Sequence, residues 1–498
     1  MKYDSQQHAH CKQGLTLVAA SLIALAVLAL SAPVLAQAQS QERELPSIGG
    51  LGGGLLSDQM EQDIGQQVMS SLRRSASQVH DPLTNDYLAS IVYRLVPHTP
   101  MNNRQLTLVV IDNPAINAFA VPGNIVGVNG GLFLNASTEQ QFGSVIAHEL
   151  AHLSQRHFSR RLEQQERSAP LTVAGIIAGI LITAATGSEA GIAAIAGTQA
   201  LSIQNMLAYS RAHEQEADRV GMDIMASAGL DPRGMPEMFE TMMRQSRLQG
   251  NRIPEYLSTH PLTQSRVSDT RSRAEQYGTA GSDDTLEYHL IRMRLQVRYA
   301  RSADDAIDAI EAYMQEPDAT QKEAARYGLA VAYLSAGRAA DAQRELDALL
   351  ASNPRRITYL VTLADALIAQ DKLSAARVLM TRALDRNPGN YPITDQLAAI
   401  ELADNNGARA ADHLRILTRD HSYREDLWLR LAEAEGKARN IIGVHRARAE
   451  YDLLMGDLES AQRQLRQAQE RVRPDAPLRQ VISERLADVN RMLANRRS

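Results

Sequence analysis

The stretch FGSVIAHELAHL, residues 142–153, decides both the fold and the chemistry of this chain. Its apolar spacing predicts a helix that is buried in a core. His148 and His152 are four residues apart, so both imidazoles lie on one face of that helix and can bind one metal ion. Glu149 is then placed to hydrogen-bond a water molecule on the ion. This arrangement of two histidines and a glutamate indicates a zinc hydrolase.

A catalytic zinc ion needs a third protein ligand, and the segment SRAHEQEADR, residues 210–219, offers one. Glu214 and Asp218 are four residues apart and share one face of a second predicted helix. Glu214 is the candidate ligand. Asp218 can orient a ligand histidine by accepting a hydrogen bond from its free ring N–H. Taken alone, the segment also suits a solvated helix with alternating charges.

Length and charge limit the class of protein. The 498 residues are enough for two or more domains, and the net charge of −5 indicates no nucleic-acid partner. The second half is rich in residues that favour helices, so we expect a mainly α protein.

The N-terminus predicts an export signal. Positive charges precede a long apolar run over residues 15–32, and cleavage after Ala38 gives a signal peptide over residues 1–38. An uncleaved anchor is the alternative. Cys11, the only cysteine, precedes the apolar run, so the mature protein contains no thiol and its metal must rely on histidine and carboxylate. An exported chain without disulfides suits the bacterial periplasm.

Residues 39–57 are glycine-rich and predict a flexible lead-in. The metal-binding domain is expected over residues 58–280, where a polar loop ends it. Within it, amphipathic helices are predicted over residues 58–74 and 85–95, and a strand over residues 106–111.

Residues 117–128, NAFAVPGNIVGV, predict a β-hairpin with Pro-Gly-Asn in its turn. Pro122 and the glycines at positions 127, 130 and 131 suit an edge strand better than a central one. In a protease, an exposed edge near the metal can accept the substrate backbone as an added strand. An ordinary sheet edge is the alternative.

Two apolar segments, residues 171–186 and 192–203, separate the two metal-binding motifs. Each is short for a membrane span, which needs about 20 residues. Three interpretations remain open: core helices, a flexible lid or substrate-contact hairpin, and a membrane-inserted hairpin.

The remaining chain, residues 284–495, predicts a helical repeat domain. Asn353-Pro354 recurs 34 residues later as Asn387-Pro388, and small and large apolar residues recur in the same register. This period is typical of tetratricopeptide repeats, which stack into arrays with a concave protein-binding surface. A plain helical bundle is the alternative.

Three motifs in combination resemble the zinc metallopeptidase family of CAAX prenyl endopeptidase and the heat-shock protease HtpX. They are HELAH at residues 148–152, EQEADRVG at residues 214–221 and NAFAVPG at residues 117–123. With its export signal and repeats, the chain is similar to periplasmic members of that family over essentially the whole mature sequence. Asn124 stands where relatives often carry glycine, which loosens the hairpin match slightly.

The resemblance implies a role for each motif residue. His148, His152 and Glu214 would bind one Zn²⁺ ion per chain, Glu149 would be the general base, and Asp218 would support a ligand from behind.

Two further residues follow from the same comparison. Glu216 is a weaker rival for the third ligand, because it cannot share a helical face with both Glu214 and Asp218. His260, in a His-Pro element that relatives also carry, would approach the metal. There it would stabilise an oxyanion or occupy the open position when the enzyme is idle. A purely structural loop is the alternative.

The implied architecture is a zincin-type α+β metalloprotease domain with a small sheet, followed by an α-solenoid of tetratricopeptide repeats. The implied activity is zinc-dependent endoproteolysis in the periplasm during outer-membrane protein assembly and quality control. Its substrates and partners would be unfolded or stalled β-barrel proteins and the barrel assembly machinery, bound through the repeats; peripheral membrane contact is allowed. A non-proteolytic chaperone or assembly scaffold is the alternative function.

Overall fold

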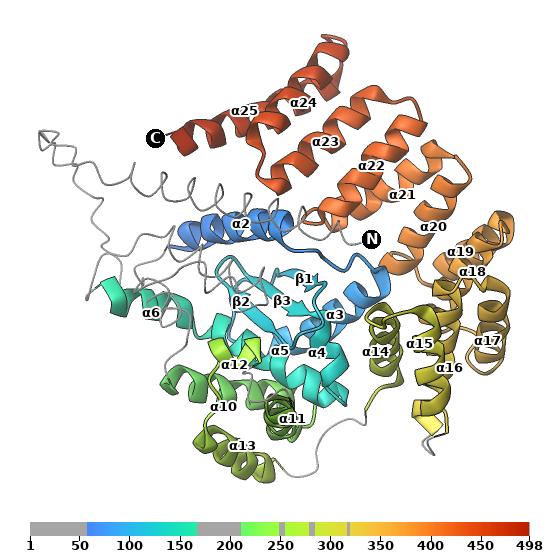
Figure 1. Ribbon diagram of the computed structural model, residues 1–498. Coiled ribbons are helices and arrows are strands. Elements are labelled where there is room, and N and C mark those ends of the chain that lie inside the picture. The colour runs from blue at the N-terminus through green and yellow to red at the C-terminus, as the bar shows by residue number, and fades with distance from the viewer. Residues whose placement is uncertain (1–56, 167–210, 249–253, 278–283, 316–318, 498) are drawn as a thin grey trace, which may run out of the picture. The chain divides into compact units, whose positions relative to one another are not determined.

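The computed structural model describes residues 57–166, 211–248, 254–277, 284–315 and 319–497 (Figure 1). The predicted signal peptide over residues 1–38 and the apolar segments 171–186 and 192–203 lie outside the described residues. No helix within the described ranges has the length and apolar composition that a membrane span requires.

Three strands form one small sheet: β1 (Thr107–Ile111), β2 (Ala118–Val121) and β3 (Ile125–Asn129). β3 is central and pairs in parallel with β1 and antiparallel with β2. The predicted hairpin is present, and its turn uses left-handed backbone at Gly123 and Asn124, with φ of 83° and 59°. These are residue types that tolerate that conformation. β2, which ends just before Pro122, is an edge strand as predicted.

The expected edge position is wrong for Gly127, which lies in the central strand. A Cβ atom at this position would lie 2.1 Å from Cζ of Phe119, because that ring on β2 lies across the glycine. The glycine therefore makes room for a neighbouring side chain and does not mark an edge. Gly130 and Gly131 are also not edge residues, since they begin helix α4.

The part of the chain that carries the metal-binding motifs is mostly helical (Figure 1). Helix α5 lies at its centre and packs against α10, α11 and β2. These elements are α2 (Asp58–Ser75), α3 (Pro82–Leu95), η1 (Val96–His98), α4 (Gly130–Asn135), α5 (Glu139–Ser154), α6 (His157–Glu166), α10 (Arg211–Ser227), α11 (Gly234–Leu248), α12 (Glu255–Thr259) and α13 (Gln264–Gln276).

Antiparallel helix pairs follow one another through the rest of the described chain (Figure 1). The pairs are α16 (Ala319–Ser335) with α17 (Ala339–Ser352), α18 (Ile357–Ala369) with α19 (Leu373–Arg386), α20 (Tyr391–Ala403) with α21 (Gly407–Asp420), α22 (Glu425–Lys437) with α23 (Ile441–Met455), and α24 (Leu458–Arg471) with α25 (Pro477–Arg497). Before them, α14 (Leu286–Arg298) and α15 (Ala303–Tyr313) each pack mainly against α16. The predicted fold class, mainly α with a small sheet and a helical repeat array, is confirmed.

The 34-residue period is visible in the backbone. Gly337, Asp371, Asn405 and Arg439 follow one another at that interval, and each has left-handed φ, between 56° and 72°. Each lies in the turn between the two helices of a pair. The recurring apolar positions are buried at the same interval, namely Ala330, Ala364 and Ala398, and Leu346, Met380 and Leu414. The period in the sequence is thus a period in both turn geometry and packing.

One hydrophobic core joins the sheet and the central helix to the first repeats. It begins at Val79 and extends to Ile400 on α20. Four aromatic rings mark the junction, with centroids 4.2 to 6.5 Å apart: Tyr87 on α3, Phe133 on α4, Phe142 on α5 and Tyr288 on α14. The later repeats have separate clusters. The domain boundary predicted between residues 280 and 284 stays a prediction, although one core crosses it.

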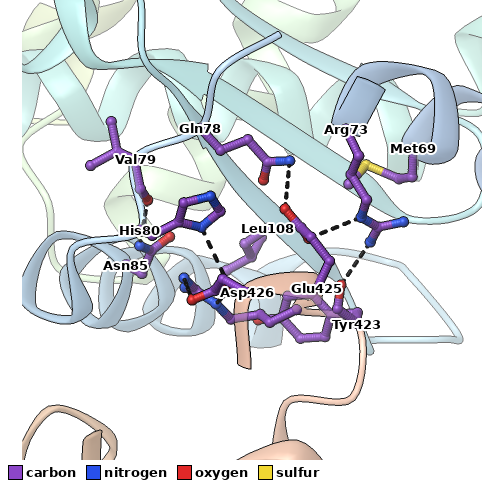
Figure 2. Close-up of a pocket in the computed structure, with 11 residues that line it drawn as sticks. Met69, Arg73, Gln78, Val79, His80, Asn85, Leu108, Tyr423, Glu425 and Asp426 are labelled. Atoms are coloured by element: carbon purple, nitrogen blue, oxygen red, sulfur yellow. Dashed lines mark hydrogen bonds and ion pairs between the residues drawn. The ribbon is translucent and has the colours of Figure 1, made fainter. Parts of the chain in front are cut away.

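A polar contact joins the first helix to a later repeat (Figure 2). Nε of Arg73 on α2 lies 3.0 Å from Oε2 of Glu425 on α22, and Nη2 donates to the carbonyl of Tyr423 at 2.7 Å. Gln78 donates to the other Glu425 oxygen at 3.0 Å. His80 lies 3.5 Å from Asp426. The N-terminal helix is therefore held against the repeats by partly buried charged groups.

Candidate metal centre

Helix α5 carries both candidate histidines and the glutamate between them. Its N-terminus is capped by Thr138, which accepts a hydrogen bond from the backbone N–H of Gln141. Every side chain from Glu139 to His152 is buried. The Nε2 atoms of His148 and His152 lie 2.9 Å apart. The two imidazoles therefore share one face and point at one place.

Helix α10 brings two carboxylates to this pair. Glu214 Oε2 lies 3.5 Å from His148 Nε2, and its Oε1 lies 3.5 Å from His152 Nε2. Asp218 approaches the first ring from behind, with Oδ1 3.0 Å from His148 Nδ1. The two helices can approach this closely because Gly221 has no side chain. A Cβ atom there would lie 3.2 Å from the backbone nitrogen of His148.

His260 follows the short helix α12 and is the fourth group at the site. Its imidazole stacks on the ring of Tyr256, with centroids 4.6 Å apart. Its Nδ1 lies 3.1 Å from Glu214 Oε1, and its Nε2 lies 3.4 Å from Glu149 Oε1. The structure thus brings His260 to the other predicted site residues.

The donor set fits a divalent cation. Ligand atoms of His148, His152, Glu214 and His260 lie within 4.8 Å of one another, and all four side chains are buried. A tetrahedral site with bonds of about 2.0 Å has about 3.3 Å between ligand atoms, close to the distances given above. Within the described part of the chain, neither carboxylate oxygen of the buried Glu149 has a hydrogen-bond partner. Such an orphaned group is costly unless a bound molecule satisfies it.

The surroundings also set the charges of the ligands. Burial disfavours a charge on His148, but its hydrogen bonds to Asp218 and Glu214 outweigh burial and raise its pKa to about 9. Burial and the neighbouring charge of His148 lower the pKa of His152. Burial favours the neutral form of Glu214, yet the charges of His260 and His148 hold its pKa well below the usual value. Glu214 is therefore ionised, as a metal ligand must be.

Arg266 on α13 supports both carboxylates of α10. Its Nε and Nη2 each lie 2.7 Å from an oxygen of Asp218, and its Nη1 lies 2.8 Å from Glu214 Oε2. This buried two-pronged contact fixes the orientation of both groups. Arg266 has no role that the sequence predicts, because no spacing rule connects residues 48 positions apart.

Glu216, the rival third ligand, lies outside the cluster. Its Oε2 is 3.2 Å from Nε2 of His157 and 3.0 Å from Nη1 of Arg160. His157 is likewise not predicted by any motif in the sequence, although its Nδ1 lies 2.7 Å from Nδ1 of His152. The backbone reverses at Arg156, with φ of 52°, between α5 and α6. Helical spacing therefore does not predict where residue 157 lies.

The edge strand β2 adjoins the site. It packs against α5, the helix with the two histidines. The backbone N–H of Tyr256 donates to the carbonyl of Ile116 at 3.4 Å, just before this strand. The segment that leads to His260 is thus attached at the start of β2.

Comparisons with known proteins agree with this geometry. The model of peptidase family M48 matches residues 82–274, which include every candidate site residue. The beta-barrel assembly-enhancing protease of Escherichia coli strain K12 is 34% identical over 444 residues, or 89% of this chain and 90% of that protein. A putative beta-barrel assembly-enhancing protease of Vibrio cholerae is 35% identical over 442 residues, covering 88% and 90%. The mitochondrial metalloendopeptidase OMA1 of Schizosaccharomyces pombe is 27% identical over 211 residues, covering 42% and 58%.

Proposed function

Because this chain belongs to peptidase family M48 and is a metalloendopeptidase, we propose that it is a zinc-dependent protease of the periplasm that degrades misfolded or stalled envelope proteins during outer-membrane protein assembly. The single observation that carries the proposal is the convergence of His148, His152 and Glu214 beside the orphaned carboxylate of Glu149. Two nitrogens and one carboxylate oxygen form a ligand set that suits zinc and leaves one position open.

Each residue then has a distinct task. His148, His152 and Glu214 would hold the ion, and Asp218 with Arg266 would fix His148 and Glu214. When bound, the ion supplies Lewis acidity, which acidifies water and polarises a carbonyl group. Glu149 accepts the proton of the attacking water and returns it to the leaving amine. Within the described residues neither of its oxygens makes a hydrogen bond, so both can take part in this transfer.

The substrate backbone would bind along β2 as an added strand. The packing of β2 on α5 supports this, because an extended peptide there passes close to the metal ligands. Backbone pairing reads little of the side-chain sequence. That property suits a protease whose substrates share a misfolded state and no common motif.

Of the two roles predicted for His260, its position favours occupation of the open metal position in the idle enzyme. Nδ1 lies 3.1 Å from Glu214 Oε1, within the same cluster of ligand atoms. Four protein ligands complete a tetrahedron and leave no place for water. In this role His260 would hold the ion in the idle enzyme and would have to withdraw before cleavage.

The names of the bacterial relatives motivate the proposed substrates and partners. Those proteins are named for enhancing barrel assembly, and they align with this chain through its repeats as well as its metal site. We assign to the repeats the docking of unfolded β-barrel proteins and of the assembly machinery. Location in the periplasm follows from the predicted signal peptide over residues 1–38.

The test is the substitution Glu149→Gln. It removes the proton acceptor and keeps the size of the side chain, so zinc stays bound one per chain while cleavage of an unfolded casein reporter falls about 10²- to 10⁴-fold. Glu240→Gln, an exposed change on α11, is the control and should leave cleavage unchanged. Unreduced cleavage by the Glu149→Gln protein rejects the proposal.

The repeat array also favours a second candidate function, a scaffold that acts without proteolysis. The same variant separates the two. If the Glu149→Gln protein promotes β-barrel assembly as well as wild type does, the scaffold accounts for that activity.

A further inference from the structure

His157 is a buried histidine that the proposed mechanism does not use. It is the first residue of α6, its side chain is fully buried, and its ring lies between a candidate metal ligand and an acidic side chain. Its Nδ1 lies 2.7 Å from Nδ1 of His152, and its Nε2 lies 3.2 Å from Oε2 of Glu216. The three groups therefore form a line that leads away from the metal position.

The direction of each hydrogen bond in this line follows from the cluster. Nε2 of His152 faces the other ligand atoms, 2.9 Å from Nε2 of His148, and must carry no proton when it binds a cation. A neutral imidazole then carries its proton on the other nitrogen, so Nδ1–H of His152 donates to Nδ1 of His157. His157 in turn carries its proton on Nε2 and donates to Glu216. Every donor in the line meets an acceptor.

His148, the other candidate histidine ligand, is held by a carboxylate without an imidazole in between. Nδ1 of His148 lies 3.0 Å from Oδ1 of Asp218, which Arg266 holds. For His152 the carboxylate is one imidazole further away. Glu216, the end of that longer line, is itself held by Arg160 at 3.0 Å.

A neighbouring ring fixes the plane of His157. The imidazole of His213 stacks on it with centroids 4.5 Å apart and planes 11° apart. The direction in which Nδ1 of His157 points is therefore set by packing as well as by Glu216.

We propose that His157 is a positioning residue of the metal centre: with Glu216 behind it, it holds His152 in the tautomer and orientation that present Nε2 to the ion. The proposal rests on the proposed function, because it assumes that His148, His152 and Glu214 bind a metal. It extends the site to a pair of residues outside the ligand set. Outer partners of this kind change metal affinity about 10- to 100-fold when they are removed.

The experiment compares His157→Phe with His157→Asn in the full-length protein. Phenylalanine keeps a flat ring and removes both hydrogen bonds, whereas the asparagine oxygen can lie near the place of Nδ1 and accept from His152. Zinc dissociation constants are measured by competition with a chelator. We expect binding about 10- to 100-fold weaker for His157→Phe and largely restored for His157→Asn. Glu216→Gln should fall between them, and Asp218→Asn provides the reference for loss at the other ligand.

Imidazole ¹⁵N spectra of the metal-free wild-type protein add a measurement that needs no variant. We expect the proton of His152 on Nδ1 and that of His157 on Nε2. Wild-type affinity in the His157→Phe protein, or a proton on Nδ1 of His157, would overturn the proposal. Failure of the wild-type protein to retain zinc would instead reject the proposed function, so the two failures are distinguishable.

Discussion

Two buried glutamates at the site differ in their partners, and this difference separates their tasks. Glu214 lies near three histidines and forms an ion pair with Arg266, so several groups compensate its charge. Glu149, one residue after His148 on α5, has neither oxygen in a hydrogen bond within the described residues. A buried carboxylate without hydrogen bonds destabilises the fold, and such groups occur mainly at functional sites. Glu149, whose oxygens lie near His260 but make no hydrogen bond, is therefore the carboxylate expected to transfer protons.

Asp86 on α3 offers a test of electrostatics at a single residue. Burial, and the nearby negative charge of Glu287 on α14, raise its pKa to about 6. The folded protein thus binds this proton more tightly than the unfolded chain does. The stability that the protonated form contributes is present below pH 4 and is lost as the pH rises to about 6.

Asp86→Asn removes this titration. We expect the variant to match the wild type in free energy of unfolding near pH 4 and to exceed it by about 2 kcal/mol at pH 7.5. Urea unfolding at the two pH values measures the difference. If the free energies of unfolding of variant and wild type differ by the same amount at both pH values, the raised pKa of Asp86 is contradicted.

At the scale of single elements, the sequence predicted the helices that carry the site but not their mutual contacts. Helical spacing placed His148 with His152 and Glu214 with Asp218, since these pairs depend on one helix each. Alternation of apolar residues predicted the strand, and turn residues predicted the hairpin. The recurrence of Asn-Pro and of apolar positions predicted the repeat period. Gly127 was misplaced because its reason, a ring on the next strand, is a tertiary contact.

The contacts that cross between elements could not be predicted in this way. Arg266 reaches Asp218 from α13, 48 residues further along the chain. His157 is only five residues after His152, but α5 ends before it and the backbone turns at Arg156, so helical spacing does not place it. His260 was placed near the metal by resemblance alone. Only the folded arrangement shows which atoms these three side chains approach.

The contact between α5 and α10 makes a prediction about a whole helix. A methyl group at Gly221 would crowd the backbone of α5, 3.2 Å from the nitrogen of His148. Gly221→Ala should therefore push α10 outward and carry Glu214 away from the histidines. We expect a loss of about 1 to 2 kcal/mol in stability and weaker zinc binding.

Gly436→Ala is the matched control, also a helix glycine changed to alanine. Its added methyl group would lie 3.8 Å from the nearest atom, an ordinary contact, on α22. It should gain up to about 1 kcal/mol from helix propensity and leave zinc binding unchanged. Equal effects of the two substitutions on zinc affinity would show that helix spacing does not control the site.

At the scale of the whole molecule, the contact of Arg73 with Glu425 joins α2 to α22, 352 residues further along the chain. The two side chains are 5% and 12% exposed, so they are screened much less than a surface pair. A double-mutant cycle with Arg73→Ala and Glu425→Ala should give a coupling of about 1 to 3 kcal/mol in thermal or urea unfolding. Loss of this coupling should also expose α2 to hydrogen exchange.

An exposed pair within the repeats calibrates this measurement. Arg301 and Asp305 lie 3.2 Å apart but are 89% and 42% exposed. Their cycle should give less than about 0.5 kcal/mol. If the cycle of Arg73 and Glu425 gives an equally small coupling energy, the contact does not hold α2 to the repeats.

The aromatic junction between α3, α4, α5 and α14 has a consequence for how a substrate would reach the metal site. The first repeats share one hydrophobic core with the helix that carries the metal site, so a flexible linker does not separate them. A protein bound to the first repeats would therefore lie at a fixed distance from the metal site. If substrates dock there, as proposed, the bond that is cleaved would depend on the length of unfolded chain beyond the docked part, and a fully folded protein would be cleaved less than one with a long unfolded stretch.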